Sequence, residues 1–505
     1  MLQDRIQFQN YKDKVISAQQ ASLFFNDKMT VGTSGFTKAG DSKAVLPAFA
    51  ERAKYENIAI TLITGASLGG TTDADLATNN ALYKRMPFQV DPVLRKKIND
   101  GSVLFIDQHL SETAELLENK HLPKLDVAVL EAAYIDENGN IVPTTSVGNS
   151  ATFAHLAEKI IIEINTTIPF DFRGLHDIYI PEGYPNRKPL QITASSERIG
   201  QDFISIDPEK VIGIVFTDIP DSPAQIALPD EKTTAIADHL LAFFENEIKE
   251  NRLTKSLLPL QAGIGKVANA VLSGFGKGDF ENLEMYSEVL QDSTFELLDS
   301  GKLQFASASS LAVSEKCYAH IMDNFQDYKD KIVLRPQQIS NSAEVIRRLG
   351  VIAINTAIEF DIYGNVNSTH LGGTKMMNGI GGSGDFARNA YLSIFVSPST
   401  SKDGNAISHV LPMVSHVDHS EHDVDVLVTE QGLADLRGLA PRERAKVIIE
   451  NCVHPEYKEA LQDYFDRACE RGGHTPHILE EAFAMHSRFN TTGSMKVPAL
   501  KPVMA

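Results

Sequence analysis

Short apolar runs alternate with amphipathic segments along the first part of the chain. The runs at 28–31, 58–63, 103–106 and 126–130 have the length of strands, and the segment 42–55 has the apolar spacing of a helix. Apolar strands that lead into small-residue loops and then helices are typical of a mostly parallel sheet covered on both faces. The pattern predicts an α/β fold in which ligands sit beyond the carboxyl ends of the strands.

The same succession recurs in the second half of the chain. Residues 125–146 and 349–370 each contain an apolar run, an aspartate and then Gly-Asn followed by a short β segment. Each copy is followed by a glycine-containing turn that enters an apolar segment, at 148–153 and 381–386. A single Asp-x-x-Gly-Asn is also a common hairpin turn. Because two motifs recur in the same order, the sequence favours a duplication.

We therefore expect two related α/β domains, 1–225 and 226–505, each a mostly parallel sheet flanked by helices. At 505 residues the chain also exceeds what one hydrophobic core usually supports. The stretch 170–230 is rich in proline and glycine, which is typical of a connecting segment. Three helices and a frayed tail are expected at the C-terminal end: 441–451, 456–471 and 476–489, with the tail at 490–505.

The balance of charge limits the kinds of ligand that the protein can bind. The chain has 47 basic and 66 acidic residues, a net charge of −19, which argues against nucleic acid as a ligand. Any polyanionic ligand must then meet a local positive patch. Arg347, Arg348, Lys375 and Lys402 are candidates near the glycine-rich loop at 378–386.

Cysteine usage and hydropathy indicate the compartment. The three cysteines are widely spaced, which excludes a disulfide framework and a cysteine-based zinc site and suits a reducing compartment. The apolar runs fall far short of the ~20 residues of a membrane helix. The first residues carry aspartates and lack the apolar core of a signal peptide. We expect a cytoplasmic protein with no membrane partner.

The glycine-rich loop has four glycines between 379 and 384. Glycine lets the backbone approach a ligand closely and point N–H groups at an anion or a developing oxyanion. The spacing also fits the dinucleotide fingerprint, which needs a preceding apolar strand and an acidic residue ~20 positions later. The preceding "GGTKMMN" is a poor strand, and Asp403 falls in a polar turn. A nicotinamide-dependent enzyme therefore remains a disfavoured alternative.

Two further stretches suggest chemistry. Residues 282–291 predict a short strand that ends near Glu288, where α/β folds place catalytic groups. A desolvated carboxylate held against an acyl group can act as a nucleophile. The alternative interpretation is that Glu288 is simply one of many exposed glutamates. The stretch 258–272 predicts a glycine pair that opens an amphipathic helix, whose N-terminus suits an anion.

Histidines gather in one segment, His409, His416, His419 and His422. The last three are spaced i, i+3, i+6, which is compatible with a metal site. A hydrogen-bonded or solvated loop is the favoured interpretation. We expect no metal.

Together these stretches resemble the acetyl-CoA hydrolase/transferase family of the class I CoA-transferases. The resemblance runs over nearly the whole chain in long ordered blocks: "VGTSGFTKAG" (31–40), "LITGAS" (62–67), "PTTSVGNSATF" (143–153), "LLPLQAGIGKVANAVL" (257–272), "YSEVLQD" (286–292), "SNSAEVIRRLG" (340–350), "DIYGNVNST" (361–369), "KMMNGIGGSGDFAR" (375–388), "HVDH" (416–419) and "VTEQGLADLRGL" (428–439).

The resemblance implies transfer of CoA from succinyl-CoA to acetate, which yields acetyl-CoA and succinate. Glu288 is then the glutamate that forms an anhydride with the acyl group and a thioester with CoA. CoA is a substrate, and no cofactor is expected to be bound permanently. The resemblance further implies a homodimer. Acyl specificity is left open, because the stretch 176–191 has no role that the resemblance supplies.

The resemblance also assigns binding positions. The oxyanion donors are the backbone amides of Ile264 and Gly382 and the side chain of Asn341, and each tetrahedral intermediate needs such donors. A glycine at 382 fits because the missing Cβ lets a carbonyl approach. Glu430 is an open alternative for positioning the glycine loop. The CoA-contacting positions are Gln261, Ala262, Gly263, Ile264, Gly265, Ile358, Asn378, Gly382 and Lys402.

Three other functions stay open at this point. The same Glu288 supports acetyl-CoA hydrolysis if water replaces acetate, and the two reactions differ in how well water is excluded. A nicotinamide-dependent oxidoreductase and a non-catalytic CoA-binding protein rank lower.

Overall fold

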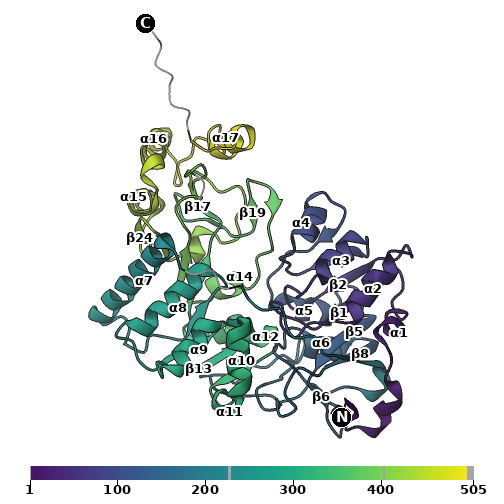
Figure 1. Cartoon of the computed structure of the whole chain (residues 1–505). Coiled ribbons are helices and arrows are strands. Elements are labelled where there is room, and N and C mark those ends of the chain that lie inside the picture. Colours follow the sequence, from purple (N-terminus) through teal and green to yellow (C-terminus); the bar gives the residue numbers. More distant parts are fainter. Residues whose placement is uncertain (1, 226–228, 402–403, 497–505) are drawn as a thin grey trace.

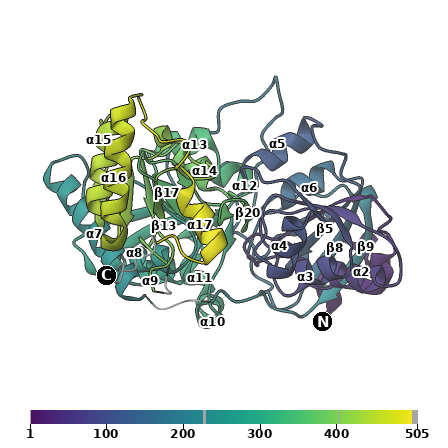
Figure 2. The ribbon, with the colours of Figure 1, turned by 90° about the horizontal axis from the view of Figure 1, so that it is seen from above.

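The computed structural model describes residues 2–225, 229–401 and 404–496. Figure 1 shows two α/β halves, the N-terminal one purple to blue and the C-terminal one green to yellow, and they are also separate in the view from above (Figure 2). Each half contains one large sheet between helices. The prediction of two related α/β domains with mostly parallel sheets is confirmed.

The N-terminal sheet has seven strands in the order β4-β3-β2-β1-β5-β8-β9, all parallel to their neighbours. In that order they are Leu104–Phe105, Leu82–Met86, Ile60–Ile63, Thr30–Thr33, Val127–Ala132, Lys159–Asn165 and Val211–Thr217. Strand β5 directs its valines toward α2 (Val45–Ala53) and directs Ala128 and Leu130 toward α6 (Ser150–Leu156). A strand buried on both faces is mostly apolar, which explains the apolar runs; in β5 the exception is Glu131, which is buried and paired with Lys43.

The C-terminal sheet has the order β15-β13-β11-β10-β16-β21-β23-β24, and only β24 is antiparallel to its neighbour. In that order the strands are Ile332–Leu334, Leu303–Ala308, Leu283–Tyr286, Leu260–Ala262, Ile352–Thr356, Leu392–Val396, Val426–Thr429 and Gly432–Asp435. In both sheets the first strand of the half lies inside the sheet and the next three extend to one edge; the following strands, three in the N-terminal sheet and four in the C-terminal sheet, extend to the other edge. The shared order supports the duplication.

The repeated Asp-x-x-Gly-Asn forms a hairpin turn in each half. Asp136 and Asp361 each accept hydrogen bonds from the amides two and four positions later, at 2.9 to 3.0 Å. The turns join β6 to β7 and β17 to β18: Tyr134–Ile135, Ile141–Val142, Glu359–Asp361 and Val366–Asn367. The turn is therefore both a local hairpin and part of a repeat.

Helices surround the two sheets. Besides α2 and α6 they include α1 (Ala18–Ser22), α3 (Thr72–Thr78), α4 (Pro92–Asn99), α5 (Glu112–Glu118), α7 (Glu231–Lys249), α8 (Lys266–Lys277), α9 (Asp292–Asp299), α10 (Glu315–Asp323), α11 (Phe325–Tyr328), α12 (Gln337–Ser340), α13 (Ala343–Leu349), α14 (Ser383–Ala387), α15 (Pro441–Cys452), α16 (Pro455–Arg471) and α17 (Ala484–Thr492). Among the described residues, no helix is long and apolar enough to cross a membrane.

The C-terminal expectations are partly wrong. The first two predicted helices match α15 and α16, but α17 starts at Ala484 instead of 476, because the preceding residues form turns. The tail was expected to fray from 490, yet Met495 is buried in the C-terminal core and its amide bonds to the Ala406 carbonyl. The remaining residues, 497–505, lie outside the described part of the chain.

The predicted connecting segment also needs correction. Residues 166–210, which we call the strap, lie between β8 and β9 of the N-terminal sheet, so they do not simply link the halves. The strap crosses onto the C-terminal half, where Leu190 and Ile192 join a core cluster with Tyr286. The predicted division at 225/226 falls in the shorter stretch between β9 and α7 and stays a prediction.

Arg335 anchors the strap. Its guanidinium is fully buried, pairs with Asp177 of the strap and donates to the strap carbonyls of Ser195 and Glu197. Asp177 in turn accepts from the Gly200 amide at 2.6 Å. A buried ion pair of this kind becomes a liability when one partner is removed.

We predict that Arg335→Met lowers the free energy of unfolding by on the order of 3–5 kcal/mol, because it leaves the Asp177 carboxylate buried without its cation. The strap should also be cleaved faster by protease. Urea unfolding and limited proteolysis measure both effects. The control is Arg467→Met on α16. Arg467 forms an exposed pair with Glu481, and its loss should change the free energy of unfolding little. Equal losses in the two variants would contradict the anchoring role.

Candidate active site

Glu288 lies at the carboxyl end of the C-terminal sheet, two residues after β11 ends at Tyr286. Its side chain is partly exposed, and Oε1 accepts a hydrogen bond of 2.7 Å from Asn341 Nδ2. Its carbonyl accepts from the amides of Ser309 and Ser310, at 2.8 and 3.2 Å. The backbone at Glu288 is therefore fixed by two hydrogen bonds.

Gly382 closes over this carboxylate. A Cβ at position 382 would lie 1.6 Å from Glu288 Oε1 and 2.3 Å from Asn341 Nδ2, well inside contact distance. The backbone there has φ −94° and ψ 1°, which any residue can adopt. The glycine is thus required for the close approach and not for its backbone angles. Glu288, Asn341 and Gly382, three predicted site residues, meet at one point.

The carboxylate is held in an environment that favours its neutral form. Burial raises the pKa of Glu288 to about 7, the hydrogen bond from Asn341 lowers it, and the nearby Asp385 carboxylate raises it further. A raised pKa beside a site of close approach is a common property of catalytic groups. An ionised Glu288 here is poorly solvated, which makes it more reactive toward an acyl carbon.

The N-terminal half supports the glycine loop. The Ile380 amide donates to Asp107 Oδ1 at 2.7 Å, and Asn378 Oδ1 accepts from Arg95 Nη2 at 2.9 Å. Gly379 has φ 141°, a conformation that side chains disfavour, and a Cβ there would press on Asp107. The loop of one half is therefore shaped by the other half.

The predicted loop at 263–265 lies beside the segment that carries Glu288. Gln291 Nε2 donates to the Gly263 carbonyl at 2.9 Å, and the Gly265 amide donates to Gln291 Oε1 at 3.4 Å. Ile264 is 51% exposed, and α8 begins directly after Gly265 with its apolar face buried, as predicted. This loop and the glycine loop both belong to the carboxyl edge of the sheet.

The predicted CoA-contacting positions differ in how exposed they are. Gln261 and Ala262 are buried in β10, where Gln261 Nε2 donates to Asn355 Oδ1 at 3.2 Å, so only 263–265 of that stretch are accessible. Ile358 follows β16 at the same edge and is partly exposed. Lys402 lies outside the described residues.

Three of the four histidines make polar contacts, whereas His422 is exposed. His419 is buried, its Nε2 lies 3.1 Å from Ser383 Oγ, and burial lowers its pKa to about 4. His416 pairs with Asp418 at 3.2 Å. In the part of the chain that the structure describes, no group of three or more histidine, cysteine or acidic side chains is arranged to hold a metal ion.

The structure gives other contacts to two charged residues that the sequence left as candidates. Glu430 does not hold the glycine loop: its carboxylate accepts from the Ser399 amide and hydroxyl, at 2.7 and 2.6 Å, and so fixes the segment before 402. Arg348 is not free for a polyanion, because it donates to the strap carbonyls of Leu190 and Ile192 at 2.7 and 3.0 Å.

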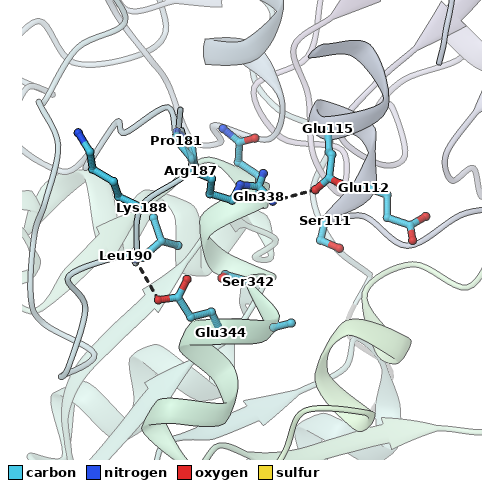
Figure 3. Close-up of a pocket in the computed structure, with 11 residues that line it drawn as sticks. Ser111, Glu112, Glu115, Pro181, Arg187, Lys188, Leu190, Gln338, Ser342 and Glu344 are labelled. Atoms are coloured by element: carbon cyan, nitrogen blue, oxygen red, sulfur yellow. Dashed lines mark hydrogen bonds and ion pairs between the residues drawn. The ribbon is translucent and has the colours of Figure 1, made fainter. Parts of the chain in front are cut away.

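Sequence reasoning gave no role to Asp385 and Ser111. Asp385 Oδ2 accepts from Asn341 Nδ2 at 3.2 Å, and Ser111 of the N-terminal half donates to the same carboxylate. The only signal was an aspartate at the start of an otherwise apolar helix. Nearby, Ser111 and Ser342 line a cavity of about 230 Å³ between the halves and the strap (Figure 3).

Comparisons with known proteins identify the class. Residues 1–216 match the acetyl-CoA hydrolase/transferase N-terminal domain and residues 316–465 the C-terminal domain of that family. The chain belongs to the acetyl-CoA hydrolase/transferase family, and the predicted resemblance is confirmed. Glu288 lies between the two matched ranges.

Relatives that span the whole chain carry two kinds of name. The chain is 48% identical to the succinyl-CoA:acetate CoA-transferase of Clostridium kluyveri, over 97% of this chain and 92% of that protein. It is 45% identical to the acetyl-CoA hydrolase of Schizosaccharomyces pombe, over 98% and 99%. The 4-hydroxybutyrate CoA-transferase structure from Porphyromonas gingivalis superposes with a TM-score of 0.62, at 21% identity, over 90% of this chain and 98% of that one, which shows a shared fold. The chain is thus an enzyme of a family that acts on CoA thioesters.

We predict that Gly382→Ala reduces thioester turnover by about 100-fold or more, because the new Cβ displaces the Glu288 carboxylate. Steady-state kinetics on acetyl-CoA and succinyl-CoA measure the loss. Gly276→Ala on α8 is the control, since its Cβ would meet only Leu297 at an ordinary 3.6 Å. Wild-type turnover in Gly382→Ala would show that the close approach is not needed.

Proposed function

We propose that this protein transfers CoA from succinyl-CoA to acetate, with Glu288 as the nucleophile. The observation that carries the proposal is the Glu288 carboxylate with its pKa raised by burial, enclosed by Asn341 and the backbone of Gly382. The name of the 48% identical relative supports the choice of substrates. CoA is a substrate in this proposal, and no permanently bound cofactor takes part.

The reaction proceeds in four balanced steps. The Glu288 carboxylate attacks the succinyl carbonyl, the C–S bond breaks, and a glutamyl anhydride and CoA thiolate form. The thiolate then attacks the glutamyl carbonyl of the anhydride, which releases succinate and leaves a Glu288–CoA thioester. Acetate attacks this thioester to give a new anhydride and thiolate. Attack of the thiolate on the acetyl carbonyl yields acetyl-CoA and restores the carboxylate.

Each attack builds an oxyanion next to Glu288. In the proposal, the Asn341 amide and the backbone amides of Gly382 and Ile264 are its donors, because donors fixed in advance stabilise developing charge most effectively. The loop at 263–265 and the position of Asn378 suit contacts with CoA. Binding energy from the CoA tail can then be used at the reacting carbon.

Hydrolysis of acetyl-CoA is the second candidate. The observation that favours it is the 45% identity to a protein named acetyl-CoA hydrolase over nearly the full length. The same Glu288 serves both reactions, and the difference is whether acetate or water reaches the acyl-enzyme. A homodimer and a cytoplasmic location remain predictions.

We predict that brief exposure to succinyl-CoA gives an adduct of CoA on the wild-type protein, detectable by intact mass and cleared by acetate. Glu288→Ala should form no adduct. Glu284→Gln, on the same strand β11, is the control and should behave as wild type. An adduct in Glu288→Ala would overturn the assignment of the nucleophile. Free CoA that accumulates regardless of acetate would identify a hydrolase.

We predict that the rate falls tenfold per pH unit below about 7, since only ionised Glu288 attacks and its pKa is raised to about 7. The stability of the folded state changes with pH in the opposite direction to the rate. The folded state holds the Glu288 proton more tightly than the unfolded state, so the stability present at low pH is lost as pH rises toward 7. Glu288→Gln should therefore gain on the order of 3 kcal/mol at pH 8 and little at pH 4. Rate profiles and urea unfolding at both pH values measure these effects, and a rate that does not change from pH 5 to 8 would contradict them.

A further inference from the structure

A series of hydrogen bonds links the N-terminal half to Glu288. Ser111 Oγ donates to Asp385 Oδ1 at 2.6 Å, and the Ser111 amide donates to Asp385 Oδ2 at 3.1 Å. Asn341 Nδ2 then donates to both Asp385 Oδ2, at 3.2 Å, and Glu288 Oε1, at 2.7 Å. Asp385 and Asn341 are buried, so these contacts are shielded from water.

This arrangement fixes the orientation of the Asn341 amide. The Nδ2 group has two hydrogens, and the two carboxylates accept one each. The Oδ1 atom faces Ser340 Oγ at 2.9 Å, which donates to it. If the amide were rotated by half a turn, Oδ1 would face both carboxylates and Nδ2 would lose its carboxylate acceptors. Without Asp385 only the contacts with Glu288 and Ser340 would select the orientation that donates to Glu288.

Ser111 connects the N-terminal half to this series of hydrogen bonds. It immediately precedes α5 and belongs to the N-terminal half, whereas Asp385 lies in α14 of the C-terminal half. Figure 3 shows Ser111 beside α5 at the cavity that separates the halves. The hydrogen bonds of the Asp385 carboxylate with Ser111 therefore depend directly on contact between the halves.

We propose that Asp385 is a positioning residue, held by Ser111, which orients Asn341 so that its amide donates to Glu288 and to the oxyanion that forms there. This inference rests on the proposed function and adds a condition to it. The nucleophile is correctly placed only when the two halves are in contact.

The charges around Asp385 come from both halves. His109 of the N-terminal half lies against Gly384, and its charge favours the ionised carboxylate. His419 contacts the neighbouring Ser383, and Glu288 lies beyond Asn341. Burial raises the pKa of Asp385 to about 6, and its negative charge raises the pKa of Glu288. A neutral group of the same shape at 385 removes this charge.

Asp385→Asn tests the proposal with an isosteric change. The new amide oxygen can take the place of Oδ2 and accept from the Ser111 amide and from Asn341 Nδ2, while the new Nδ2 donates to Ser111 Oγ. The variant thus keeps the contacts but replaces a charge-assisted hydrogen bond to Asn341 by a weaker neutral one. We expect kcat to fall by about 30-fold with KM for succinyl-CoA within about threefold. The acid limb of the rate profile should move to lower pH, because a neutral side chain no longer raises the pKa of Glu288.

Ser111 supplies a milder second test. Ser111→Ala keeps the backbone donor and removes only the hydroxyl, so kcat should fall by about tenfold, and Ser111→Thr should restore it. Because both residues act through Asn341, the double variant Ser111→Ala/Asp385→Asn should be no slower than Asp385→Asn alone. If Asp385→Asn does not fold, the Ala and Thr variants at 111 decide: wild-type kcat in Ser111→Ala would overturn the proposal.

Asp361→Asn is the matched control. Asp361 is also a buried aspartate of the C-terminal half, but it holds its own turn and the Val414 amide. Among the described residues, none of its hydrogen bonds involves Asn341 or Glu288. This variant should lose stability while its kcat and acid limb stay unchanged. Wild-type kcat and an unshifted acid limb in Asp385→Asn would overturn the positioning role. Failure of the wild-type protein to form a CoA adduct would instead refute the proposed function itself.

Discussion

The closeness of Glu288 to the backbone of Gly382 is the constraint on which the rest of the site depends. A single Cβ at 382 would overlap the carboxylate, so the loop must present bare backbone at that point. A glycine-rich loop is flexible by itself, and here the N-terminal half supplies the rigidity through Asp107, which accepts from the Ile380 amide. Catalytic geometry is thus obtained by packing one half of the molecule against the most permissive segment of the other.

The duplication explains why there is one such site. Gly65 follows β2 as Glu288 follows β11, two residues after the strand ends. At Gly65 a Cβ would meet the Gly35 carbonyl at 2.6 Å and Gln337 Oε1 at 2.9 Å, so no side chain fits there. The N-terminal half keeps the architecture of the repeat without its nucleophile. It contributes instead by supporting the glycine loop, the strap and, through Ser111, Asp385.

The site is maintained at a cost to the fold. An acidic side chain with a pKa raised to about 7 is destabilised when it ionises, and the neighbouring Asp385 adds to that cost. Stability comes from regions away from Glu288, where the apolar strands are covered on both faces. Strain at functional sites is commonly offset in this way.

The sequence by itself determined the sheets, the duplication and the family, because apolar periodicity and glycine positions are local properties of the chain. It also placed Glu288 at a strand end and Gly382 in a close-approach loop. Tertiary structure alone decided that Ser111 bonds to Asp385, that Arg348 and Arg335 are used by the strap, and that Glu430 fixes Ser399. These contacts join residues up to hundreds of positions apart. Their existence depends on how the two halves pack, which no local pattern of hydrophobic and polar residues records.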